Sequence, residues 1–216
     1  TDGTSWTSRT SGTSNNLHRG TYGNSTFVVV GLNGTILTSS DGITWTSRTS
    51  GTSNILWAVT YVNSTFLTVG DNGTILTSSD GASWTSRTSG TTKDLWEATY
   101  YGNGNFMTVG DNGTILTSSD GTTWTSKTSG TTNQLWGVTY GNGIFVVVGP
   151  DGYIYTTSDG NSLTSRTSGI SNDMWGITYG NSTFVTGGYG GEILTSSDNG
   201  TTWTSRTSGT TNELHG

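Results

Sequence analysis

A turn element built on aspartate and glycine recurs along the chain at a nearly constant spacing. Its copies begin at Asp2, Asp41, Asp80, Asp120, Asp159 and Asp198. Successive copies lie 39 residues apart, except for one interval of 40 residues. Four-stranded propeller blades repeat every 40 to 45 residues or so, whereas leucine-rich repeats have a period of about 20 to 29 residues. The spacing therefore predicts a β-propeller.

Each repeat divides into four strand-like runs separated by turn residues. In the copy that starts at Leu56, the runs cover 56–61, 66–70, 74–77 and 84–88. Asp71-Asn72-Gly73 stands between the second and third runs and predicts a tight turn, because Asn and Gly tolerate positive φ. Four short antiparallel strands in each repeat are what one propeller blade requires.

The fourth run occurs six times and the other three runs occur five times each. The fold class that we expect is therefore all-β, a five-bladed β-propeller of four-stranded antiparallel blades with about 39 residues per repeat. The expected blades cover approximately 17–55, 56–94, 95–134, 135–173 and 174–216 of a single domain, 1–216. Residues 1–16 duplicate the outer strand and loop of 197–213. Either copy can complete the last blade, so we expect a monomer or a strand-exchanged dimer.

The composition agrees with an all-β fold. Hydrophobic residues make up 29% of the chain and charged residues 10%, and the chain has nine Trp, nine Tyr and a single proline. Most of the rest is Thr, Ser, Gly and Asn. Thr and aromatic residues favour strands, whereas Gly and Asn favour turns. No helical pattern of apolar residues competes with the strands.

The segment from Ser39 to Trp45 resembles the Asp-box, a hairpin motif between the third and fourth strands of propeller blades. Ser196 to Trp203 matches the usual Ser-x-Asp-x-Gly-x-Thr-Trp pattern in full. The copy at Asp159 departs most, because Thr and Leu replace the Ser and the Trp. We expect a structural role for Asp41, Asp80, Asp120, Asp159 and Asp198, whose carboxylates can accept backbone N–H groups of their own turns. The whole repeat also looks like that of photosystem II assembly-factor propellers and bacterial Asp-box propellers, which implies the fold rather than a function.

Charge and composition disfavour several classes of partner. The formal net charge of −6 opposes binding to nucleic acid or to an anionic membrane surface. No apolar run is long enough for membrane insertion. The absence of cysteine removes thiolate metal sites, and Asp-Asn-Gly lacks the further acids of a calcium loop, so we expect no metal and no cofactor. The cellular compartment stays open.

The sequence predicts that the protein is not an enzyme. Asp-box propellers include sialidases, and that resemblance implies a cluster of three arginines around the substrate carboxylate. Here five of the six arginines belong to the repeated outer strand, and only Arg19 stands apart. The two histidines, His18 and His215, occupy equivalent places of the repeat. A repeated pattern does not bring together the unlike residues that catalysis needs, so we expect no catalytic residue.

A lectin-like, multivalent carbohydrate site is the leading functional hypothesis. A Trp, or His18 in the first repeat, begins each inner strand, next to loops rich in Asn and Asp. Aromatic rings beside Asn and Asp suit a sugar, which offers C–H faces and hydroxyl groups. The expected ligand-binding residues are His18, Trp57, Trp96, Trp136, Trp175, Asn54, Asn133, Asp71, Asn72, Asp111 and Asn112. The same Trp rings can instead fill the spaces between blades.

Two alternatives to carbohydrate binding stay open. The first is a protein-binding or assembly scaffold, which uses the residues that break the repeat, namely Arg19, Glu97, Pro150, Tyr153, Tyr155 and Tyr189. Glu97 is expected at the solvated surface. The second is an amplified or engineered repeat protein with no evolved ligand, because the Thr-Ser-Arg-Thr-Ser-Gly segment recurs almost unchanged.

Overall fold

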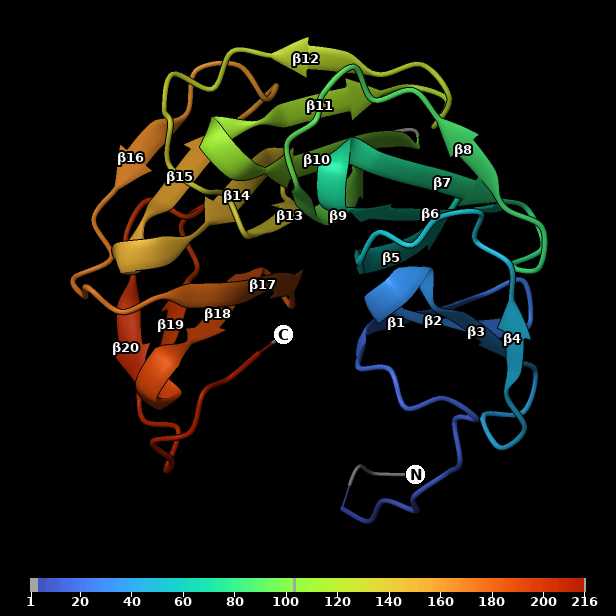
Figure 1. The fold of residues 1–216 in the computed structure, drawn as a ribbon. Coiled ribbons are helices and arrows are strands. Elements are labelled where there is room, and N and C mark those ends of the chain that lie inside the picture. Colours follow the sequence, from blue (N-terminus) through green and yellow to red (C-terminus); the bar gives the residue numbers. More distant parts are fainter. Residues whose placement is uncertain (1–3, 103, 216) are drawn as a thin grey trace.

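The computed structural model describes residues 4–102 and 104–215. These residues form five four-stranded antiparallel sheets, each made of four consecutive strands. The sheets are arranged like propeller blades around a central axis (Figure 1). The predicted fold class is confirmed.

Each blade runs from an inner strand at the axis to an outer strand at the rim. The inner strands are β1 (Leu17–Gly23), β5 (Leu56–Val62), β9 (Leu95–Tyr101), β13 (Gly137–Gly141) and β17 (Met174–Gly180). The second strands are β2 (Thr26–Gly31), β6 (Thr65–Gly70), β10 (Asn105–Gly110), β14 (Ile144–Val148) and β18 (Thr183–Gly188). The third strands are β3 (Ile36–Ser39), β7 (Thr74–Ser78), β11 (Ile115–Ser118), β15 (Ile154–Thr157) and β19 (Ile193–Ser196). The outer strands are β4 (Thr46–Arg48), β8 (Thr85–Arg87), β12 (Thr125–Lys127), β16 (Thr164–Arg166) and β20 (Thr204–Arg206).

The turn between the second and third strands is a single turn of 3-10 helix in every blade. These turns are η1 (Leu32–Gly34), η2 (Asp71–Gly73), η3 (Asp111–Gly113), η4 (Pro150–Gly152) and η5 (Tyr189–Gly191). Their central residue is left-handed, with φ of 54° at Asn72 and 53° at Asn112. Asn adopts this conformation more easily than other non-Gly residues, so the tight turn predicted from the Asp-Asn-Gly pattern is present. The described residues contain no longer helix.

Blade 4 begins its inner strand later than the pattern predicts. We expected a first run from Leu135, but β13 starts at Gly137. In other blades the first residue of the 3-10 turn donates its N–H to the segment before the inner strand, as Asp71 does to the Ile55 carbonyl at 3.0 Å. Pro150 occupies this place in blade 4 and has no N–H to donate. The ladder therefore starts two residues further along.

The Asp-box hairpins form as the resemblance implies. The Asp41 Oδ1 atom accepts the N–H groups of Ile43 and Thr44, both at 2.8 Å, and the Ser39 hydroxyl at 2.9 Å. Asp80, Asp120 and Asp198 accept the corresponding bonds. The divergent Asp159 accepts the Asn161 N–H at 2.8 Å. The copy at Asp2 lies outside the described residues.

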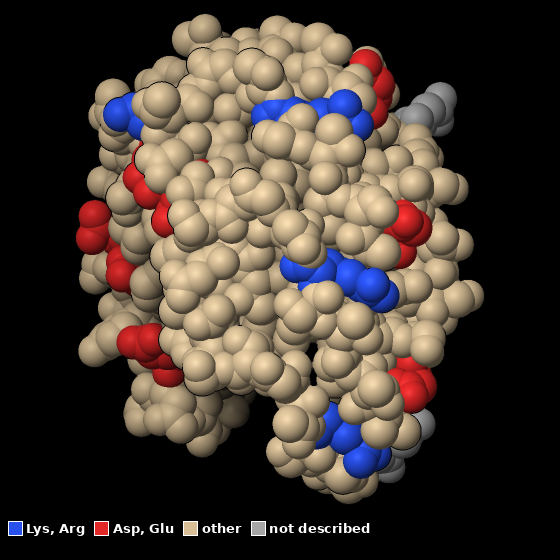
Figure 2. Space-filling model, turned by 45° about the vertical axis from the view of Figure 1, so that its right-hand side comes forward, with Lys and Arg blue, Asp and Glu red and all other residues tan. Residues whose placement is uncertain are grey.

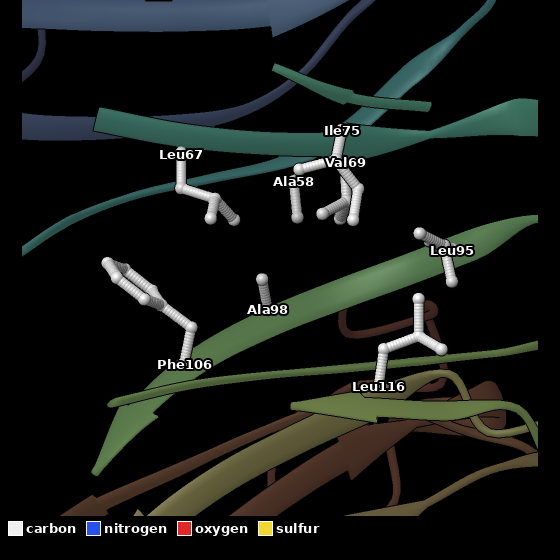
Figure 3. Close-up of a cluster of buried hydrophobic side chains, with 8 residues drawn as sticks. All are labelled: Ala58, Leu67, Val69, Ile75, Leu95, Ala98, Phe106 and Leu116. Carbon is white, nitrogen blue, oxygen red and sulfur yellow. The ribbon is translucent and has the colours of Figure 1, made fainter. Parts of the chain in front are cut away.

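The hydrophobic core lies between blades. One cluster joins blade 2 to blade 3 (Figure 3) and consists of Ala58, Leu67, Val69, Ile75, Leu95, Ala98, Phe106 and Leu116. Equivalent clusters join blade 1 to blade 2, blade 3 to blade 4, and blade 4 to blade 5. Among the described residues, no such cluster joins blade 5 to blade 1. The five blades therefore form an arc that is open between its two ends (Figure 1).

The two copies of the outer-strand sequence adopt different structures at the opening of the arc. The C-terminal copy forms β20, which pairs with β19 and completes blade 5. The described part of the N-terminal copy, residues 4–16, forms no strand. Its loop nevertheless keeps the geometry of the other blade connections, because Asn15 Nδ2 donates to Thr35 Oγ1 at 2.8 Å as Asn54 Nδ2 does to Thr74 Oγ1. The question that the sequence left open is thus answered in favour of the C-terminal copy.

Charged side chains are scattered over the rim. Each outer-strand arginine of blades 1, 2, 4 and 5 donates from Nε to a threonine of the third strand, as Arg48 does to Thr38 Oγ1 at 2.8 Å. On the face drawn in Figure 2, basic and acidic groups are small and separate on a largely uncharged surface. The same view shows a notch at the lower edge of the molecule, the side on which the arc is open in Figure 1.

Core packing between blades predicts a large effect of truncation. Leu67 is fully buried between blades 2 and 3, so Leu67→Ala should lower the free energy of unfolding by about 3 kcal/mol. Thermal and denaturant unfolding followed by circular dichroism measure this loss. The control is Tyr189→Ala at a side chain that is 54% exposed, where little change is expected. A Leu67→Ala loss no larger than that of the control would contradict the assigned core.

Acid should unfold the Asp-box hairpins. The backbone N–H groups of Thr44 and Ile43, with the Ser39 hydroxyl, lower the pKa of Asp41 to about 2. The same kind of hydrogen bonding lowers the pKa of the other four described Asp-box aspartates. An unfolded aspartate titrates near 3.9. Their contribution to stability is therefore complete above about pH 4 and is lost as the pH falls towards about 2 and below.

We expect the melting temperature to stay level from neutral pH to about pH 5 and then to fall steeply. Asp41→Asn should lower stability at neutral pH and make the acid loss smaller. A melting temperature that does not change between neutral pH and about pH 2 would contradict this role.

Candidate functional site

A cavity of about 730 Å³ opens at the axis of the arc, on the side where the inner strands begin. It is lined by Leu17, His18, Arg19, Trp57, Trp96, Gln134, Trp136, Trp175 and His215. Every blade contributes to this lining at the start of its inner strand. Ligand pockets of proteins commonly measure about 300 to 1,000 Å³ and are rich in aromatic side chains. The cavity therefore has the size and the lining of a binding site.

Strand alternation places the aromatic residues in the cavity. Leu56 is fully buried in the core between blades 1 and 2. Successive side chains of a strand point to opposite sides, so Trp57 leaves that core and lies half-buried at the axis. The same Leu-Trp or Met-Trp pair begins the inner run of every later blade. Repetition of one two-residue pattern thus gathers all four indoles at one point.

The aromatic rings pack against each other in two groups. His18 lies 4.4 Å from Trp57, and Trp57 lies 4.7 Å from Trp96, between ring centroids. On the other side, Trp136 and Trp175 are stacked at 4.6 Å with an interplanar angle of 9°. His215 follows at 5.4 Å from Trp175. The rings therefore form two packed groups in the lining rather than one separate platform in each blade.

The indole N–H groups differ in their partners. Trp57 Nε1 donates to Asp71 Oδ1 at 2.6 Å, and Trp96 Nε1 donates to Asp111 Oδ1 at 2.7 Å. Tyr189 takes the corresponding place in blade 5. The Trp175 N–H is buried there and has no hydrogen-bond partner. A buried donor without an acceptor costs about 1 to 3 kcal/mol, so this N–H favours a ligand that displaces the groups covering it and brings an acceptor.

A second unsatisfied group lies at the first blade. His18 Nε2 is buried without a hydrogen-bond partner. Burial and the neighbouring Arg19 charge lower the pKa of His18, against a smaller opposing effect of Asp71. The neutral imidazole is therefore the dominant form at neutral pH, and it presents a polar nitrogen next to the aromatic lining.

A charged pair beside the cavity links two blades that are not neighbours. Arg19 of blade 1 and Glu97 of blade 3 approach to 3.5 Å between Nε and Oε2, and about a quarter of each side chain is exposed. Burial raises the pKa of Glu97, and Arg19 partly offsets this rise. The expectation that Glu97 lies at the solvated surface is wrong, because its place at the start of an inner strand turns it inwards. Gly137 and Gly176 occupy the same repeat position in blades 4 and 5, so only one half of the cavity carries charge.

The predicted ligand-binding residues lie in four different environments. Trp57, Trp96, Trp136, Trp175 and His18 line the cavity. Asp71 and Asp111 support two of the indoles. The amides of Asn54 and Asn133 donate to Thr74 and Tyr155 of the following blade, at 2.8 and 2.7 Å. Asn72 and Asn112 lie instead in shallow surface grooves beside the outer-strand cations of blades 2 and 3.

Sequence reasoning missed the lining roles of Leu17, Gln134 and His215. The lining role of His215 could have been predicted, since it stands at the Trp position of the repeat. Arg19 was noticed only as a residue that breaks the repeat. No group of three or more His, Cys, Asp or Glu side chains in the described part of the chain is placed to hold a metal ion. None of the described helices has the length and apolar character needed to cross a membrane.

Solved structures with the same fold include two of YCF48. The structure titled YCF48 bound to D1 peptide superposes with a TM-score of 0.71 at 18% identity, over 89% of this chain and 67% of that one. YCF48 from Cyanidioschyzon merolae gives a TM-score of 0.71 at 15% identity, over 94% of this chain and 75% of that one. At these identities the likeness concerns the fold. No curated protein sequence matches the chain.

A family model described as the DUF6242 beta propeller domain matches residues 58–174, from the inner strand of blade 2 to the start of blade 5. This match covers more than half of the chain. The protein therefore belongs to the DUF6242 beta propeller domain family.

Proposed function

We propose that the protein is a non-enzymatic binding module that holds a short peptide segment of a protein partner in the axial cavity. The observation that carries the proposal is an aromatic cavity of about 730 Å³ whose wall contains a buried indole N–H without a partner, that of Trp175. Peptides supply both apolar side chains for such a wall and carbonyl oxygens for such a donor.

The side chains that line the cavity would contribute most of the binding energy. Aromatic side chains contribute large apolar areas to recognition and are enriched at protein interfaces. A ligand carbonyl on Trp175 Nε1 would also remove the cost of a buried unsatisfied donor. The neutral His18 offers a second polar contact on the opposite side of the cavity. An apolar residue flanked by backbone carbonyls meets all of these demands.

The asymmetry of the cavity gives the peptide a direction. The Arg19 and Glu97 pair stands on the side of blades 1 and 3, whereas glycines occupy that position in blades 4 and 5. The apolar part of a ligand fits beside the stacked Trp136 and Trp175, which line the cavity. Polar groups of the ligand then face the charged pair.

The fold comparison supports a protein partner. A propeller of the same fold, YCF48, has been solved with a D1 peptide bound. That complex belongs to YCF48, and the likeness to this chain is one of fold at 18% identity. It adds to the argument that a propeller of this architecture can present a peptide site, and it favours the scaffold alternative over carbohydrate binding.

Carbohydrate binding takes second place. A sugar platform in each blade needs a free ring face, but here the neighbouring rings pack on each other at 4.4 to 4.7 Å. Asn54 and Asn133 use their amide groups in bonds to the following blade. Glycan binding stays a prediction, and a glycan array on the same protein is its test.

The peptide proposal predicts different effects of two conservative substitutions. The purified chain is screened against a display library of random linear peptides, and affinities of the selected peptides are measured by calorimetry. Trp175→Phe keeps a ring but deletes the unpaired N–H, so it should weaken binding about tenfold, equivalent to one hydrogen bond. Trp57→Phe deletes an N–H already bonded to Asp71. This matched control should change affinity about twofold at most while lowering stability.

Two results would overturn the proposal. One is a library that yields no peptide bound above background by the folded chain. The other is a selected peptide whose affinity is unchanged by Trp175→Phe and by Trp136→Ala, because that peptide then binds elsewhere.

A further inference from the structure

The two ends of the arc expose faces that every other blade buries. Leu17 and Phe27 of blade 1 are each 37% exposed. The residues at the same repeat positions in the other four blades are between 0% and 2% exposed, because the preceding blade covers them. On blade 5, Val185 and Ile193 are only partly buried. Their equivalents on blade 2, Leu67 and Ile75, are 0% exposed.

A tyrosine and a glycine show that the two exposed faces match each other. Tyr61 of blade 2 packs over Gly23 of blade 1 so closely that a Cβ at Gly23 would overlap its ring. Tyr179 of blade 5 covers Gly141 of blade 4 in the same manner. The next glycine of this series is Gly180 of blade 5, and a Cβ there would meet nothing within 4 Å.

The tyrosine that would fill this place stands on blade 1. Tyr22 occupies the repeat position of Tyr61 and Tyr179, next to Phe27 at 4.5 Å between ring centroids. It is 57% exposed. One end of the arc thus carries a projecting ring, and the other end carries an empty socket of the kind that receives such a ring elsewhere in the fold.

We propose that these faces are the two halves of a blade-to-blade interface between copies of the protein, with blade 1 of a second copy docked on blade 5. The occupant follows from continuity with the four interfaces already present, since blade 1 of a second copy repeats the contact that each blade makes with the one before it. Closing the arc within one chain would instead change the angle at four close-packed interfaces, which resist deformation. Docking a second copy leaves all four unchanged.

The C-terminal segment must move aside for this contact. The Leu214 N–H donates to the Gly188 carbonyl at 3.0 Å, as Leu135 does to Gly110 and Met174 does to Gly149. Leu214 also lies against Gly187 on the exposed face of blade 5. Leu214 thereby occupies the position on blade 5 that Leu17 of the second copy would take. Deletion of residues 213–216 should therefore strengthen the association of copies.

The interface is head-to-tail, so it can be blocked separately at each end. Tyr22→Arg blocks the projecting face, and Gly180→Arg fills the socket, where the substituted side chain has open space in the single chain. Tyr100→Arg is the matched control, because Tyr100 has the same repeat position on blade 3, is 51% exposed and lies away from the opening. Light scattering and sedimentation velocity over a wide concentration range measure the mass.

The wild-type protein and Tyr100→Arg should form species larger than the monomer as concentration rises. Tyr22→Arg and Gly180→Arg should each associate about tenfold more weakly or stay monomeric. A mixture of the two variants should give a dimer and no larger species, because each partner retains one intact face. Circular dichroism checks that both variants are folded. Thr178→Arg, at an exposed position paired with Val185, replaces Gly180→Arg if that variant fails the check.

A wild-type protein that stays monomeric at every concentration would overturn the proposal. So would association that survives in both blocked variants, since the copies then meet through another surface. A mixture that remains monomeric while the wild type associates would also contradict a head-to-tail contact.

Discussion

Each blade buries its apolar face only against the next blade, and the rest of the molecule depends on this contact. The clusters between blades contain fully buried residues such as Leu67, Phe106 and Leu116. One sheet of short strands cannot bury both of its faces alone. The Asp-box hairpins and the 3-10 turns hold the strands of a blade together. Stability of the whole arc nevertheless comes from four repeated interfaces, and the fifth is left uncovered.

The axial cavity is a consequence of the same contact. A leucine or methionine at the start of each inner run is fixed in the core in blades 2 to 5, and the adjacent Trp is thereby turned towards the axis. Single residues that differ between the blades then make the lining of the cavity asymmetric. Blade 5 has Tyr189 at the repeat position that Asp71 and Asp111 occupy in blades 2 and 3, so the Trp175 N–H has no partner. Arg19 of blade 1, which lines the cavity, forms a charged pair with Glu97 of blade 3.

The sequence predicted the repeated features well and the unique features poorly. Local patterns were sufficient to predict the strands, the turns with a left-handed central residue such as Asn72, and the Asp-box hydrogen bonds. All of these depend on residues that are close in sequence. The late start of β13 required one further step, since a proline at position 150 removes a donor that other blades use. Convergence of the four indoles, the burial of Glu97 and the open arc depend on the angle between blades. No local pattern encodes that angle, and the choice between two near-identical outer strands is settled only by which segment reaches β19.

The open arc is tested most directly by hydroxyl-radical footprinting of the protein at a dilution where it is monomeric. Phe27 and Phe66 have the same repeat position, but Phe27 is 37% exposed and Phe66 is 0% exposed. The account predicts rapid labelling of Phe27 and Tyr22 and protection of Phe66. Equal protection of Phe27 and Phe66 in the monomer would contradict it, because blade 1 would then already be covered within a single chain.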